Sequence, residues 1–303
     1  NLSQAHHRCF GVLMPGPDQD SGYWRMIMDG IESALRELAH HYVTARYFHY
    51  ERIGDPSSFA SATEELLASD CSGVLLAPGP EQEATRLVNS LETTPCVVFD
   101  GELPDARPIA TVHQDSFESG LIAAKLLHLL NPRNAMLTVT VGPEDYHLSR
   151  RREGFMSYFS HRDSPQIRHL ELTNFREPEE AHKRLQVTGP GVGGVFVTNA
   201  LGYIVAKALN AEEENHTPIV GYDLLSQNAG CLRDGTMDFV IHQDPRRQGY
   251  NSVYALYRRV VLNETVEPRV RMPIDIVMKE NLAFHIGAGE QVPEGAAHGC
   301  NNR

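Results

Sequence analysis

Four polar side chains stand at the ends of short apolar runs, where they could bind a small molecule that offers hydroxyl groups. Asp100 ends the run CVVFD, Asn199 ends GVFVTN, Asp223 ends PIVGYD and Gln243 ends DFVIHQ. Carboxylates accept hydrogen bonds, whereas carboxamides both accept and donate them. A hydroxyl also does both, so this set of groups suits a ligand that carries several hydroxyls.

An arginine and two aromatic residues could complete the same site. Arg151 is expected in the first turn of a helix that follows the run AMLTVTV (135–141), and its guanidinium would donate. The segment 16–24 follows the first apolar run and holds Tyr23 beside Trp24, the one tryptophan of the chain. Taken singly, such residues are more simply explained as helix caps or turn formers. As a set at equivalent strand ends, they would converge on one crevice.

Short apolar runs alternate with amphipathic stretches along the chain, and these elements must position the polar residues. The runs are rich in Val, Ile, Leu and Phe and often lack alternation, as strands buried on both faces of a parallel sheet do. The expected strands are 9–14, 42–50, 73–77, 96–100, 109–113, 135–141, 166–172, 194–199, 218–223 and 238–243. The expected helices are 22–39, 57–69, 80–91, 116–130 (with Ser116 as its N-cap), 149–159, 178–186, 200–210, 224–233 and 245–262.

Strand–helix–strand repetition of this kind predicts an α/β fold of doubly wound parallel sheets with right-handed crossovers. Such sheets bind their ligands at the carboxyl ends of the strands. The polar residues named above stand at those ends, so the expected fold and the expected site agree.

A short internal repeat helps to place the lobes. Val-His-Gln-Asp (112–115) and Ile-His-Gln-Asp (241–244) are each expected to end a strand and begin a helix. The repeat is either a coincidence or a mark of the places where the chain passes between two similar lobes, and the strand-like run 272–278 could be a third passage. We expect an N-terminal lobe of 1–112 plus 244–273 and a C-terminal lobe of 113–243 plus 274–303, joined by a three-segment hinge.

Composition excludes several classes of protein. The length of 303 residues suggests about two domains. The sequence contains no run of eighteen apolar residues, the length that a membrane-spanning helix needs. The 39 acidic residues outnumber the 27 basic ones, which argues against this segment binding DNA phosphates unaided. The five cysteines are scattered without a Cys-x-x-Cys pair or zinc spacing, so we expect no metal site and a reducing compartment.

Motifs of catalysis and cofactor binding are absent or misplaced in the sequence. A literal G-x-G-x-x-G lies at 189–194, but it precedes an expected strand instead of following one, so it cannot cradle a dinucleotide phosphate. No P-loop, H-E-x-x-H or G-x-S-x-G motif occurs. We therefore expect no cofactor and no enzyme. One alternative stays open, in which Asp100 and Asp223 act as an acid and a base.

Several motifs occur in an ordered set along the chain. They are FGVLMP (10–15), Tyr23-Trp24 ahead of GIE (30–32), GVLL (73–76), VVFD (97–100), DSFESG (115–120), RREGF (151–155), VTN (197–199), VGYD (220–223) and IHQ (241–243) with Gly249 following. In this order they resemble the effector-binding core of LacI/GalR-type transcriptional regulators and the related periplasmic sugar-binding proteins, over residues 8–284. The version with LSRRREGF (148–155) and MPIDI (272–276) resembles the branch found in gut Bacteroidetes.

The resemblance implies a type I periplasmic-binding-protein-like fold and roles for the site residues. Arg151 matches the arginine of the R-x-x-G-F pattern that contacts the effector, and Tyr23 and Trp24 match the aromatic pair after the first strand. The positions that hydrogen-bond a sugar or nucleobase in other members are matched by Asp100, Asn199, Asp223 and Gln243. The family often has Asn-Asp where this chain has Asn199-Ala200, which leaves the identity of the effector open.

The resemblance also implies partners. Regulators of this family begin with a helix-turn-helix of about sixty residues that reads DNA, and here the first apolar run starts within ten residues of residue 1. We expect the sensing domain of a cytoplasmic, homodimeric regulator that binds a small, carbohydrate-like effector and reaches DNA only through the missing domain, without contact to a membrane. The alternative is an exported sugar-binding protein of a transporter. Whether the regulator is a repressor or an activator stays open.

Overall fold

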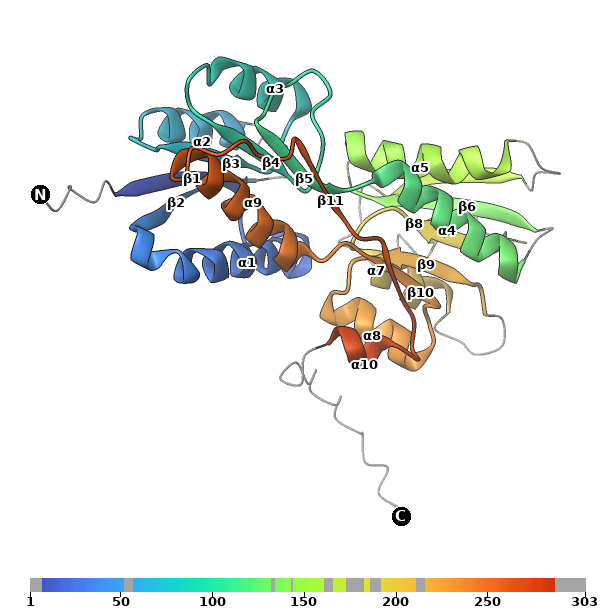
Figure 1. Cartoon of the computed structure of the whole chain (residues 1–303). Coiled ribbons are helices and arrows are strands. Elements are labelled where there is room, and N and C mark those ends of the chain that lie inside the picture. Colours follow the sequence, from blue (N-terminus) through green and yellow to red (C-terminus); the bar gives the residue numbers. More distant parts are fainter. Residues whose placement is uncertain are drawn as a thin grey trace, which may run out of the picture.

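The computed structural model describes residues 7–51, 57–131, 134–142, 144–160, 166–172, 183–185, 192–210 and 216–286. These residues form two α/β lobes that lie side by side, each a sheet with helices on both faces (Figure 1). The predicted two-lobe α/β fold is confirmed. We call the lobe that holds β1 the N-terminal lobe and the other the C-terminal lobe.

The N-terminal lobe is built on a parallel sheet in the order β11-β5-β4-β3-β1-β2. Its strands are β1 (Arg8–Pro15), β2 (Val43–Tyr50), β3 (Gly73–Leu76), β4 (Cys96–Phe99), β5 (Ala110–Gln114) and β11 (Arg269–Met272). α1 (Tyr23–Glu37) and α9 (Pro245–Val260) cover one face, and α2 (Ser57–Leu67) and α3 (Glu81–Ser90) cover the other. Every residue of β3 and β4 is buried, as predicted for central parallel strands.

The C-terminal lobe repeats this plan with the strand order β12-β10-β9-β8-β6-β7. Its strands are β6 (Ala135–Val141), β7 (Ile167–Leu172), β8 (Val192–Val197), β9 (Ile219–Tyr222), β10 (Phe239–His242) and β12 (Asp275–Val277), the last antiparallel to β10. α4 (Ser116–Leu130) and α5 (Tyr146–Phe159) pack on one face, and α7 (Gly202–Leu209), α8 (Ser226–Asp234) and α10 (Leu282–His285) on the other. Among the described residues, no helix is both long and apolar enough to span a membrane.

The chain passes between the lobes three times, as Figure 1 shows at the centre of the molecule. The passages lie between β5 and α4, between β10 and α9, and between β11 and β12. The two His-Gln-Asp repeats stand at the first two. The run 272–278 is not one strand, because Pro273 separates β11 in one sheet from β12 in the other.

Four sequence-based expectations differ from the structure. β5 keeps His113 and Gln114 in the N-terminal sheet, two residues beyond the expected boundary. Ser116 is not the N-cap of α4, because the Asp115 carboxylate accepts from the Glu118 amide at 3.1 Å. Asp145 caps α5 in the same way, so this helix begins at Tyr146 and not at 149. Arg151 consequently lies in the second turn, not the first. Most of the expected helix 178–186 and the first half of the glycine-rich segment 189–194 lie outside the described residues.

Glycines allow the helices on one face of each sheet to cross at close range. A Cβ on Gly30 of α1 would lie 1.9 Å from the carbonyl oxygen of Arg246 in α9. The equivalent crossing in the other lobe uses Gly120 of α4, whose Cβ would lie 1.9 Å from the Arg151 carbonyl oxygen in α5. Backbone cannot move aside as a flexible side chain can, so α5 and Arg151 sit where they do because residue 120 is glycine.

Substituting Gly120→Ala is therefore expected to lower the free energy of unfolding by about 1–3 kcal/mol, the usual effect of overpacking a well-packed interior. Urea denaturation followed by circular dichroism measures this change. Gly230→Ala on α8 is the matched control, because a Cβ there meets no heavy atom within 4 Å. The control should gain about 0.5–1 kcal/mol from its higher helix propensity. Equal stabilities of the two variants would contradict the close-approach argument.

Candidate functional site

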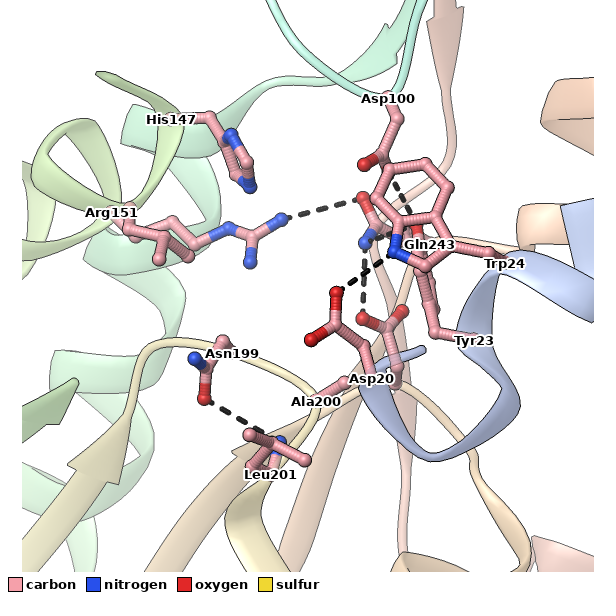
Figure 2. A pocket seen from close by; sticks show the side chains of 12 residues that line it. Asp20, Tyr23, Trp24, Asp100, His147, Arg151, Asn199, Ala200, Leu201 and Gln243 are labelled. Atoms are coloured by element: carbon pink, nitrogen blue, oxygen red, sulfur yellow. Dashed lines mark hydrogen bonds between the residues drawn. The ribbon is translucent and has the colours of Figure 1, made fainter. Parts of the chain in front are cut away.

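A small cavity lies between the lobes at the carboxyl ends of both sheets (Figure 2). All seven residues predicted from the sequence line it, and five further residues join them. The lining consists of the predicted Tyr23, Trp24, Asp100, Arg151, Asn199, Asp223 and Gln243, together with Asp20, His147, Leu148, Ala200 and Leu201. The structure thus brings the predicted residues to one place, and their role in binding stays a prediction.

The N-terminal lobe contributes a carboxylate and two aromatic rings. Asp100 follows β4 directly and adopts a left-handed backbone with φ of 68°, which turns the chain at the strand end. Its carboxylate accepts a hydrogen bond from the Tyr23 hydroxyl at the start of α1. The next residue, Trp24, donates its indole N–H to the Asp20 carboxylate at 2.8 Å. The aromatic pair is therefore held by acidic residues on either side.

The C-terminal lobe contributes the arginine. The Arg151 guanidinium lies 3.6 Å from the centre of the Tyr222 ring and donates to the Thr198 carbonyl at 2.8 Å. A second N–H reaches Gln243 Oε1 at 3.4 Å. Only 2% of Arg151 is exposed. Nearby, the Asn199 amide donates to the Val141 carbonyl at 2.6 Å, which fixes its orientation.

Gln243 connects the two sides of the cavity. Its Nε2 donates to the Tyr23 hydroxyl at 2.9 Å and to Asp223 Oδ2 at 3.1 Å. Asp223 follows β9 as Asp100 follows β4, with φ of 59° and its amide bonded to the neighbouring strand. Figure 2 shows Gln243 between the arginine of one lobe and the tyrosine of the other. Its contacts link the two lobes through one carboxamide.

Burial sets the electrostatics of the site. Burial, with Asp100 nearby, raises the pKa of Asp223 from 3.8 to about 7, although Arg151 acts in the opposite direction. Burial and the adjacent carboxylates likewise hold the pKa of Tyr23 well above its usual value. Among the residues that line the cavity, two buried side-chain atoms have no hydrogen-bond partner within the described part of the chain: Asp223 Oδ1 and Arg151 Nε. The site therefore retains one unused acceptor and one unused donor.

The cavity has a volume of about 40 Å³. A water molecule needs roughly 10–15 Å³ on this measure, and small-molecule pockets are commonly about 300–1,000 Å³. A molecule as large as a monosaccharide therefore enters only if the lobes separate or the Gln243 side chain moves. The three-segment hinge allows the first of these.

Sequence reasoning missed two polar lining residues, Asp20 and His147. Asp20 lies inside the segment 16–24 that also holds the aromatic pair. The sequence therefore indicates that this segment lies near the site, but it does not distinguish the Asp20 side chain from its neighbours. His147 stands four residues before Arg151 on α5, a spacing that puts two side chains on one helix face. In the described residues, no three His, Cys, Asp or Glu side chains gather as a metal site would require.

A comparison with family models finds one match, described as a periplasmic binding protein domain, over residues 10–264. Among solved structures, a "putative LacI transcriptional regulator" from Bacteroides fragilis is 27% identical with a TM-score of 0.84, covering 92% of this chain and 99% of that one. A glucose-galactose binding protein from Geobacillus stearothermophilus is 22% identical with a TM-score of 0.79, covering 91% and 99%.

A third solved structure, an ABC transporter solute binding protein from Burkholderia graminis in complex with D-arabinose, is 17% identical with a TM-score of 0.80, covering 93% of this chain and 98% of that one. At these identities, the similarity to the two binding proteins shows a shared fold. A comparison with curated protein sequences finds no significant match.

Proposed function

Because the chain belongs to the periplasmic binding protein domain family, we propose that it is the ligand-sensing domain of a LacI-type transcriptional regulator. It binds a small, sugar-like effector between the lobes. The observation that carries this proposal is the convergence of hydrogen-bonding side chains from both lobes on one cavity. The regulator is favoured because, of the three structures compared above, the Bacteroides fragilis protein has the highest sequence identity to this chain and the highest TM-score.

The site chemistry suits a carbohydrate. Asp100 and Asp223 accept from ligand hydroxyls, Arg151 donates, and Asn199 and Gln243 do either. The ring of Trp24 covers an apolar sugar face. Charge-assisted hydrogen bonds contribute about 1.5–3 kcal/mol each, so two or three of them, after the cost of association, fit a micromolar ligand at about −8 kcal/mol.

Binding residues from both lobes couple the ligand to the hinge. A ligand that touches both lobes favours the closed arrangement, which shifts the population of hinge angles. In a homodimer, this movement changes the spacing of helix-turn-helix modules attached to the N-terminal lobes. A coupling free energy of about 1–3 kcal/mol is enough to switch DNA occupancy.

The second candidate is an exported sugar-binding protein of a transporter, which is supported by the fold shared with a glucose-galactose binding protein and with an ABC transporter solute binding protein. The four described cysteines, Cys9, Cys71, Cys96 and Cys231, are free, which fits the cytoplasmic regulator better. The mass in solution separates the candidates, because the regulator requires a dimer and binding proteins are usually monomers. An enzyme using Asp100 and Asp223 is not favoured, since the matching family model describes a binding domain.

A thermal-shift screen with mono- and oligosaccharides tests the proposal. A sugar that binds the folded chain raises its melting temperature by mass action. Trp24 is the sole tryptophan and lines the cavity, so its fluorescence should change when the same sugar is titrated into the protein. If no sugar moves either signal at millimolar concentration, the carbohydrate assignment is wrong. If a sugar binds to a monomeric protein, the transporter alternative replaces the regulator.

A further inference from the structure

One side chain joins all three passages of the hinge. Gln114 ends β5 at the first passage, and its Nε2 donates to the His242 carbonyl at the second and to the Pro273 carbonyl at the third, at 3.1 and 2.7 Å. Its Oε1 accepts from the Tyr222 hydroxyl at 2.6 Å. Gln114 is 2% exposed. Both amide protons and the carbonyl are therefore engaged inside the protein.

Tyr222 carries this contact to the candidate site. It is the last residue of β9, fully buried, and its ring supports the Arg151 guanidinium at 3.6 Å. Its hydroxyl reaches the hinge while its ring face reaches the site, so one rigid side chain touches both. Because an aromatic side chain has only two rotatable bonds, a displacement of the hydroxyl also displaces the ring.

We propose that Gln114 and Tyr222 are positioning residues that transmit the hinge angle to Arg151. Bending the hinge changes the distances between the three passages, and the two carbonyl contacts of Gln114 cannot both survive a large change. Gln114 then shifts, Tyr222 follows, and the guanidinium leaves or enters its place beside Gln243. This inference deepens the proposed function and rests on it, because it makes the placement of the arginine depend on lobe closure.

A purely structural role would predict something different. If Gln114 only filled the core, its replacement would destabilise the protein without altering the effect of a change at Arg151. Transmission through Tyr222 instead requires the two effects to depend on each other. Trp24 offers the readout, because it lines the cavity, is 4% exposed and packs in a cluster with Ala200 and Leu225 of the opposite lobe. Lobe opening therefore raises its accessibility to acrylamide.

The experiment is a double-mutant cycle on the full chain without added sugar. Gln114→Met and Arg151→Met are made singly and together, in the native background and in Tyr222→Phe, which keeps the ring and removes the hydroxyl. The acrylamide quenching constant of Trp24 is measured for each variant. Tyr47→Phe is the matched control background, because the buried Tyr47 hydroxyl has no hydrogen-bond partner in the described residues. Gln114→Leu, which also removes the amide without adding a charge, replaces Gln114→Met if the latter does not fold.

We expect the two substitutions to deviate from independent effects by about twofold or more in the native and Tyr47→Phe backgrounds. In the Tyr222→Phe background they should act independently. Independent effects in the native background, or equal coupling in all three backgrounds, would overturn the proposal. If sugars bind but the two substitutions act independently, the inference about Gln114 and Tyr222 is wrong and the proposed function stands. If the substitutions are coupled but no sugar binds, the inference stands and the proposed sugar ligand is wrong.

Discussion

Replacing Arg151 with alanine is expected to weaken sugar binding by about 100-fold, the larger end of what one charge-assisted donor contributes. The guanidinium is 2% exposed and holds Gln243 in place, so its loss removes a donor and also loosens the residue that links the lobes. Asp223 then lies buried without the arginine that favours its ionised form. The Asp223 carboxyl group then binds a proton near neutral pH, so the stability cost comes mainly from the Thr198 carbonyl and Gln243 carboxamide oxygens that lose their donor, about 1–3 kcal/mol in the free energy of unfolding.

Isothermal titration with the sugar found in the screen measures the first effect, and urea denaturation measures the second. Arg150→Ala is the matched control, because Arg150 neighbours Arg151 on α5 but forms a partly exposed ion pair with Glu153. Its loss should change stability by less than about 1 kcal/mol. An unchanged binding isotherm for Arg151→Ala would remove this residue from the site.

The fold was predictable because its strands are short, apolar and unalternating. β3, β4 and β9 are buried on both faces, so nearly all of their residues are apolar and the run is visible in the sequence. Helix starts were harder to place. Asp115 and Asp145 take the N-cap positions, but a sequence rich in polar residues at these boundaries offers several candidate caps, including Ser116.

The candidate site was predictable to the extent that it depends on strand ends. Parallel strands bring their carboxyl ends to one edge of a sheet, so Asp100 and Asp223 had to lie near the cleft. The contacts that close the cavity depend on three-dimensional geometry instead. Gln114 bonds Pro273, 159 positions away, and Gln243 bonds Tyr23, 220 positions away. No local pattern encodes such pairs, so the hinge contacts and the small volume emerged only from the structure.

Asp223→Asn is expected to stabilise the protein above pH 7 and to weaken sugar binding at the same pH. Because burial raises the pKa of Asp223 from 3.8 to about 7, the folded chain binds a proton more tightly than the unfolded chain. The contribution of this group to stability is therefore greatest below pH 4, falls as the pH rises towards 7, and stays low above it. The difference corresponds to on the order of 4 kcal/mol.

Asparagine has the same shape and no charge to desolvate, so the variant should match the native protein near pH 4 and exceed its stability at pH 8. Urea denaturation at several pH values measures this difference. Asp105→Asn, at an exposed aspartate of the N-terminal lobe, is the control and should show no such pH-dependent gain.

The same Asp223→Asn substitution should weaken sugar binding. A neutral amide oxygen is a weaker acceptor than a carboxylate, so we expect a loss of about tenfold in affinity. A variant that gains stability at pH 8 and keeps full affinity would show that Asp223 is a buried structural acid and not a ligand contact. A gain in stability together with a loss in affinity is the result expected of a binding site, because the buried charge of Asp223 destabilises the free protein and accepts a hydrogen bond from the ligand.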